Sequence, residues 1–153
     1  MTAIRVIGIG SPFGSDRIGW DALDRLTSGL DTSEVSFISL DRPGASLLEY
    51  MQDVKTVVLV DAVKAGLEPG SLVRLKEDQI ECSNSVNSTH GFGVAEAIAL
   101  GRELGNLPEK LVLFGLETGD DPEWMPSSRS IDELKELITT EIAVCLGETI
   151  RVN

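Results

Sequence analysis

Acidic side chains stand at or shortly after the ends of apolar runs in this sequence, together with a single histidine. Asp41, Asp61 and Glu117 each follow such a run directly, whereas Asp16 follows the first run after a glycine-containing turn. His90 stands beside a glycine and shortly before a stretch with helical periodicity. Because open α/β sheets bind ligands outside the carboxyl ends of their strands, we expect these groups to face one crevice. Carboxylates and an imidazole around one crevice suit a borderline divalent metal such as zinc, nickel or iron.

Each of these residues also has an ordinary structural explanation. Asp16 fits the N-cap of a helix that begins near it, and Asp41 fits a turn because Arg-Pro-Gly follows it. A lone histidine such as His90 is more often a hydrogen-bonded loop or core residue than a ligand. Solvation explains the acidic loop behind Glu117, although Glu117 itself ends a buried run in the same way as Asp61. Asp61 is harder to explain in this way, because it ends a run apolar enough to be buried on both faces. The convergence on one edge favours a shared functional site.

Stretches of β-branched residues alternate with stretches of helical periodicity, which is typical of βαβ units around a largely parallel sheet. We therefore predict a three-layer α/β/α sandwich around a mostly parallel, twisted sheet of about five strands. The predicted strands are Ile4–Ile9, Val35–Leu40, Thr56–Val60, Ser71–Leu75 and Leu111–Leu116. The predicted buried helix faces consist of Ile18, Ala22, Leu23 and Leu26, then Val94, Ala97, Ile98 and Leu104, then Ile131, Leu134, Ile138, Ile142 and Cys145. Residues 77–89 and 118–129 are predicted loops, and Ser130 with Glu133 has capping-box spacing.

The composition limits the size, the location and the partners of the protein. A chain of 153 residues that is 42% hydrophobic can bury one core but not two, so residues 1–153 are predicted to form one domain. A formal charge of -12 and a pI near 4.4 disfavour nucleic acids and anionic membranes, and favour a protein partner or a metal. Cys82 and Cys145 lack CxxC spacing and are predicted to be thiols. The apolar N-terminal run is too short to span a bilayer and unlike a secretory signal, so we expect a cytoplasmic protein.

A glycine turn after the first strand with an acid ending the second is also typical of dinucleotide-binding domains. Here the turn reads Gly-Ile-Gly-Ser-Pro-Phe-Gly, which is GxGxxxG rather than GxGxxG. Pro12 and Phe13 would stand where backbone amides approach a pyrophosphate, so nucleotide binding is the weaker hypothesis. The sequence contains no P-loop, HExxH, GxSxG or CxxC pattern.

Several segments in the right order resemble the hydrogenase maturation proteases. Gly8-Ile9-Gly10 followed by Asp16 and Gly19 resembles the family's N-terminal motif, and the strand ending in Asp61 resembles its strand with an essential aspartate. Further matching segments are Ser88-Thr89-His90, Leu113-Phe114-Gly115-Leu116-Glu117 and Glu123-Trp124 with the helix after it. Departures also occur: Ser11 replaces the usual asparagine, Arg17 replaces an acidic or small residue, and Asp41-Arg42-Pro43-Gly44 replaces a glycine-rich turn.

The resemblance implies an endopeptidase that removes a C-terminal extension from the nickel-loaded large-subunit precursor of a nickel-iron hydrogenase. By position, Asp16, Asp61 and His90 match the family's metal-contacting residues, and Asp41 matches a further acid implicated in cleavage. All four are therefore candidate catalytic residues, and the nickel is expected to come with the substrate. The implied partner is the precursor, and no binding of nucleic acid or membrane is expected. The oligomeric state is left open between a monomer and an oligomer. A non-enzymatic metal-binding maturation chaperone is the alternative, because ligands alone do not distinguish holding a metal from using it.

Overall fold

The computed structural model of the chain describes residues 3–12, 17–27, 33–82, 93–121 and 123–150, without the side chains of residues 81, 82 and 148–150. Its elements in chain order are β1 (Ile4–Gly10), α1 (Ile18–Thr27), β2 (Val35–Asp41), the 3₁₀ helix η2 (Gly44–Met51), β3 (Thr56–Val63), β4 (Leu72–Lys76), α2 (Glu77–Cys82), α3 (Val94–Leu104), β5 (Lys110–Glu117) and α4 (Ser128–Ile150). Within the described part of the chain, none of the helices has both the length and the apolar character needed to cross a bilayer.

The strands of the described residues form one sheet in the order β2-β1-β3-β5-β4. β1, β2, β3 and β5 are parallel, and β4 pairs antiparallel with β5 at the edge. The chain passes from β1 to β2 on one side and then continues to β3 on the other side of β1. The winding therefore reverses between β1 and β3, and the carboxyl ends of these two strands form the switch point at which open α/β sheets bind ligands.

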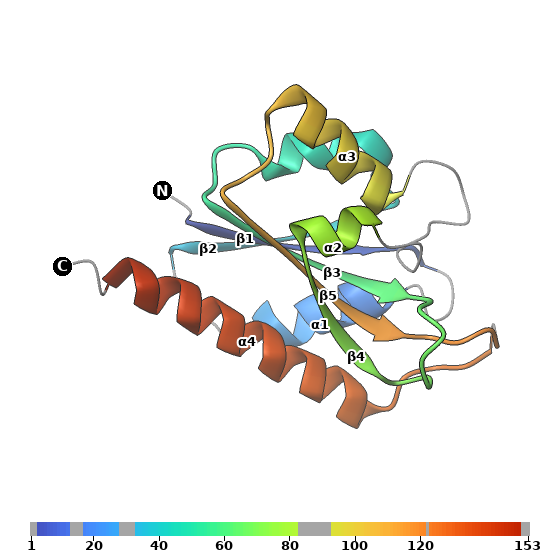
Figure 1. Cartoon of the computed structure of the whole chain (residues 1–153). Helices are drawn as coiled ribbons and strands as arrows, with labels where there is room; N and C mark the ends of the chain where they lie inside the picture. The colour runs from blue at the N-terminus through green and yellow to red at the C-terminus, as the bar shows by residue number, and fades with distance from the viewer. Residues whose placement is uncertain (1–2, 13–16, 28–32, 83–92, 122, 151–153) are drawn as a thin grey trace.

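Helices cover both faces of the sheet and make three layers (Figure 1). α1 and α4 lie on one face, and η2, α2 and α3 lie on the other. Alternate residues of the central strands supply the two cores: Val58, Val60, Val112 and Phe114 face α1 and α4, and Val57, Leu59, Leu111 and Leu113 face η2, α2 and α3. The parallel strands are buried on both faces, which is why they read as continuous apolar runs in the sequence.

The N-terminal end of α1 lies directly against the ends of β1 and β3. A Cβ atom built on Gly19 would be 2.4 Å from the carbonyl oxygen of Ile9 and 2.6 Å from that of Val60. Both distances are far below van der Waals contact, so only glycine allows the helix to approach the sheet this closely. The tight contact fixes the start of α1 at the switch point, on the side of the strand arrowheads in Figure 1.

The predicted fold class is confirmed, since the sheet is mostly parallel and lies between two helical layers. Each predicted strand is present, with bounds that differ by one to three residues. The predicted buried faces of α1 and α4 are also confirmed, because all their residues are buried.

Four details of the prediction are wrong. Residues 77–82 form helix α2 and not a loop, and its Ile80 is fully buried, so one apolar residue among polar ones is enough to hold this short helix on the core. Leu104 is 62% exposed, because it is the last residue of α3 and the buried face of that helix ends at Gly101. The last helix begins at Ser128, before the end of the predicted loop. Its cap is Ser127 rather than Ser130: the Ser127 hydroxyl accepts the N–H of Ser130 at 3.1 Å, and Glu133 pairs with Arg129.

Candidate active site at the carboxyl edge of the sheet

Asp61 lies near the carboxyl end of β3, beside the switch point. It follows five buried residues of β3 and pairs in register with Gly115 of β5. Alternation along the strand puts its side chain on the same face as Leu59 and Val63, the face covered by α2 and α3. The side chain is half-buried, and its Oδ1 accepts the N–H of Ala62 at 2.8 Å. The Asp61 carboxylate is therefore oriented by a hydrogen bond and lies at the edge of the sheet where the sequence predicts a site.

Asp41 is the last residue of β2 and pairs in register with Gly10 of β1. Since β1 separates β2 from β3, Asp41 and Asp61 lie two interstrand spacings apart, which is about 9–10 Å between backbones. The Asp41 side chain is exposed, and its Oδ1 accepts a hydrogen bond from Arg42 Nε at 2.7 Å. Alternation along β2 puts Asp41 on the face of Phe37, which is opposite to the face of Asp61, so the two acids share one edge of the sheet but not one face.

Two of the predicted metal ligands, Asp16 and His90, lie outside the described residues, so their convergence with Asp61 stays a prediction. Within the ranges that the structure describes, no three His, Cys, Asp or Glu side chains are grouped as metal ligands. The elements that follow the two residues are described. α1 begins two residues after Asp16 and α3 begins four residues after His90. Both helices start on the side of the strand arrowheads (Figure 1).

Glu117 ends β5 and is the most deeply buried acid of the described residues, with 1% of its surface exposed. Its Oε1 accepts the backbone N–H groups of Ala65 at 2.6 Å and Leu67 at 3.1 Å, and its Oε2 accepts that of Gly119 at 2.9 Å. Burial alone would raise the pKa of this carboxyl, but these hydrogen bonds and one from Thr118 outweigh burial, so the pKa lies below its ordinary value. Glu117 is thus charged at neutral pH, and its carboxylate accepts hydrogen bonds from backbone N–H groups of the neighbouring loops.

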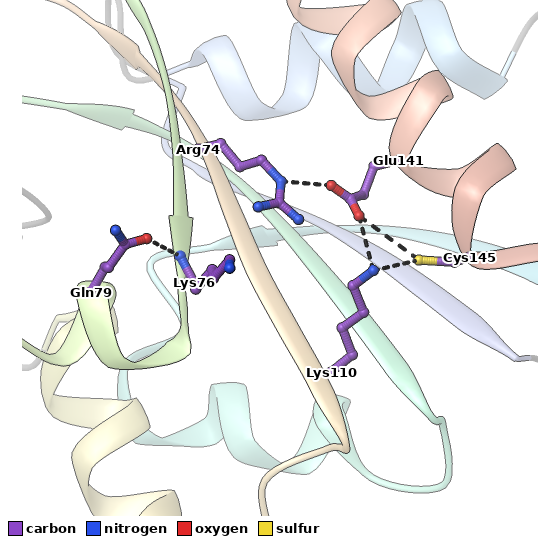
Figure 2. A network of polar contacts seen from close by, with 6 residues as sticks. All are labelled: Arg74, Lys76, Gln79, Lys110, Glu141 and Cys145. Carbon is purple, nitrogen blue, oxygen red and sulfur yellow. Dashed lines mark hydrogen bonds and ion pairs between the residues drawn. The ribbon is translucent and has the colours of Figure 1, made fainter. Parts of the chain in front are cut away.

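A second acid, Glu141 on α4, was not singled out by the sequence. It accepts hydrogen bonds from Arg74 Nε of β4 at 2.7 Å and forms an ion pair with Lys110 Nζ of β5 at 3.1 Å (Figure 2). Lys110 also lies 3.3 Å from the thiol of Cys145, which is a buried cysteine outside any disulfide, as predicted. The signal that was available is an acid inside the apolar stripe of α4, next to Ile142. This cluster lies on the α4 face of the sheet and joins three elements.

The sequence model of one protein family, described as hydrogenase maturation protease, matches residues 24–146, which is most of the chain. The chain belongs to this family. As a family member, it resembles the hydrogenase expression/formation protein HupD of Thiocapsa roseopersicina, with 29% identity over 94% of this chain and 66% of that protein. It is also 24% identical to the putative hydrogenase maturation protease MJ0253 of Methanocaldococcus jannaschii, over 95% of each chain.

The similarity to solved structures extends over the whole fold. The hydrogenase maturating endopeptidase HybD from E. coli superposes with a TM-score of 0.76, covering 97% of this chain and 94% of that chain. At 21% identity, this likeness shows the fold of the family member and not its chemistry. The chain spans slightly less than two thirds of the length of several curated HupD relatives, namely 66%, 65% and 62%.

Proposed function

We propose that this chain is an endopeptidase that removes a C-terminal extension from the nickel-loaded large-subunit precursor of a nickel-iron hydrogenase. Membership of the maturation protease family supports this activity. The observation that carries it is the position of Asp61, a held carboxylate at the end of a buried strand, beside the switch point of the sheet. We propose that the reaction takes place in the cytoplasm, which suits a chain whose Cys145 is a thiol and not part of a disulfide.

In this proposal Asp16, Asp61 and His90 bind nickel that the precursor carries. Two carboxylates and one imidazole are a donor set that suits nickel. The hydrogen bond from the Ala62 N–H to Asp61 Oδ1 restricts the rotation of that carboxylate, so its direction is set before the substrate arrives. When bound, the nickel would either polarise a nearby carbonyl or water as a Lewis acid or serve only to identify the loaded precursor. The protein's own contribution is to hold the precursor so that one peptide bond lies next to that metal.

We assign Asp41 a role in orienting the substrate. Its distance from Asp61 across β1 and its ion pair with Arg42 argue against a proton shared between the two acids. A carboxylate two strands away is well suited to contact an extended precursor segment that crosses the edge of the sheet. General-base action by Asp41 through a water molecule is the second hypothesis for this residue.

The isolated enzyme should bind divalent metal only weakly. A stable zinc or nickel site ordinarily needs four protein ligands or three well-supported ones, and only Asp16, Asp61 and His90 are proposed here. We therefore expect no stoichiometric metal after purification without added metal salts. Elemental analysis tests this expectation. One chelator-resistant zinc per chain that cleavage requires would instead identify an ordinary metallopeptidase.

The deciding experiment mixes the purified protein with nickel-loaded and with nickel-free precursor, and follows the mass of the precursor. A loss of mass at the precursor's C-terminus that occurs only with nickel supports the proposal. Metal uptake without cleavage would identify the alternative, a non-enzymatic maturation chaperone. Binding of a nucleotide by the isolated protein, with no cleavage of the precursor, would support the dinucleotide-binding hypothesis instead.

A further inference from the structure

The loop between β3 and β4 begins three residues after Asp61 and is held by the buried Glu117. Every side chain from Lys64 to Pro69 is exposed, and Leu67 has 45% of its surface in contact with solvent. A loop whose side chains all face solvent has no core of its own to fix its shape. Its conformation must therefore come from hydrogen bonds to its backbone.

The two ends and the middle of this loop are held in different ways. At the ends, the N–H of Thr118 donates to the carbonyl of Val63 at 3.1 Å, and the N–H of Gly70 donates to the carbonyl of Glu117 at 2.8 Å. These are backbone contacts that a side-chain substitution leaves in place. In the middle, Ala65 and Leu67 both donate to the side-chain Oε1 of Glu117. The carboxylate of Glu117 is therefore the group that shapes the tip of the loop.

The same carboxylate ties this loop to the loop after β5. Its second oxygen accepts the N–H of Gly119, and a Cβ on Gly119 would lie 2.8 Å from Cγ of Pro69, so the two loops are in direct contact. Both loops leave the sheet at its carboxyl edge, since β3 and β5 are parallel and Val63 pairs in register with Glu117. Glu117 thus holds together two loops at the carboxyl edge of the sheet, one of which begins three residues after Asp61, while it is itself buried.

We propose that Glu117 is a positioning residue for the cleavage reaction: it fixes the Lys64–Gly70 loop so that Leu67 contacts the precursor segment bound beside Asp61. This inference rests on the proposed function. The occupant is an extended peptide with an apolar side chain, because the loop that carries the exposed Leu67 begins three residues after Asp61. Glu117 acts through the loop and makes no contact with the reacting atoms.

A double-mutant cycle on precursor cleavage tests the inference. Leu67→Ala should raise KM for the nickel-loaded precursor at least about fivefold with little change in kcat, because it removes an exposed binding contact. Glu117→Gln should raise KM by a similar factor, because it leaves Ala65 and Leu67 only a weaker, neutral acceptor and puts its NH2 group against the N–H of Gly119. In the Glu117→Gln background, Leu67→Ala should then add no more than about twofold, because the loop is already displaced. Leu104→Ala, which removes another exposed leucine from the end of α3, is the matched control and should leave KM unchanged.

The assays are run below the melting temperature of each variant, with circular dichroism as a check of folding. Faster amide hydrogen exchange at Ala65 and Leu67 in Glu117→Gln, with unchanged exchange in the core strands, would show that the carboxylate shapes the loop. Effects of Glu117→Gln and Leu67→Ala that multiply independently, or a folded Glu117→Gln with wild-type KM, would overturn the inference alone. A wild-type protein that cleaves no nickel-loaded precursor would overturn the proposed function itself.

Discussion

Glu117 and Glu141 are both buried carboxylates with a lowered pKa, but their hydrogen-bond donors differ in kind. Glu117 accepts neutral backbone N–H groups from two loops at the carboxyl edge of the sheet. Glu141 forms ion pairs with two charged side chains, Arg74 of β4 and Lys110 of β5, on the face that α4 covers (Figure 2). The first arrangement shapes loops beside the candidate site, and the second attaches a helix to the sheet. In our proposal the carboxyl edge serves function, whereas the α4 face serves stability.

The physical cause of the pKa shift is therefore also different in the two regions. For Glu141, burial would raise the pKa, and the hydrogen bonds and charges of Arg74 and Lys110 outweigh burial and lower it. For Lys110, burial would lower the pKa, and its contacts with Glu141 and Cys145 outweigh burial and raise it. Each partner of the pair thus favours the charged form of the other.

The largest effect on activity is expected at the carboxyl edge. Asp61→Asn removes the charge of the proposed nickel ligand and keeps the shape of the side chain, so precursor cleavage should fall at least about 100-fold while the fold is preserved. The measurement is the precursor mass shift, with circular dichroism as the check of folding. Glu103→Gln, which removes an exposed acid of α3, is the control and should cleave at the wild-type rate. Wild-type cleavage by a folded Asp61→Asn variant would remove Asp61 from the site, and with it the functional side of the comparison.

The largest effect on stability is expected where α1 meets the same edge. Gly19→Ala adds a Cβ that would collide with the backbone carbonyls of Ile9 and Val60, so the free energy of unfolding should fall by about 3 kcal/mol. Gly147→Ala in α4 is the matched control, because nothing lies within 4 Å of its added Cβ. It should leave stability unchanged or raise it by about 0.5–1 kcal/mol through helix propensity. Urea unfolding of the two variants gives both values, and equal effects would show that α1 can shift away from the sheet at low cost.

Most of the fold could be predicted from the sequence, because a buried parallel strand needs an unbroken apolar run and leaves that run visible. The location of Asp61 followed from the same pattern, since an acid directly after such a run lies at the carboxyl edge of the sheet. Asp16 and His90 lie outside the described residues, so the predicted ligand set of Asp16, Asp61 and His90 stays a prediction.

Features that depend on contacts between distant segments could not be predicted. The loop-holding role of Glu117 depends on the path of the Lys64–Gly70 backbone, which no side-chain pattern encodes. The cluster around Glu141 depends on Arg74 in the edge strand β4, which lies 67 residues before Glu141 in the sequence. Helix α2 was missed because Ile80 is its only deeply buried described residue, too few to show a period.

A smaller effect on stability separates the α4 face from the site. Glu141→Gln should lower the free energy of unfolding by about 1–2 kcal/mol at neutral pH, less than for a fully buried pair because Arg74 and Lys110 are partly exposed. Cleavage of the precursor below the melting temperature should be unchanged. Because the folded-state pKa of Glu141 is depressed below 4.5, its contribution is present above that value and is lost as the pH falls through the folded-state pKa. The difference in stability between the wild type and Glu141→Gln should therefore shrink on acidification, and a difference that grows would contradict the ion-pair interpretation.

The smallest predicted effect distinguishes the two carboxylates by their response to salt. Ionic strength of about 1 M screens charges beyond roughly 3 Å, and the partly exposed side chains of Arg74 and Lys110 are accessible to that screening. The stability lost in Glu141→Gln should therefore be about 0.5 kcal/mol smaller in high salt than in low salt. The loss in Glu117→Gln should be the same in both, because its donors are short, neutral backbone N–H groups around a carboxylate that is 1% exposed. Urea unfolding of the wild type and the two variants at both salt concentrations measures the two differences. If the stability losses of both variants changed equally with salt, the contribution of Glu117 to stability would also depend on nearby charges. The two carboxylates would then differ only in their location.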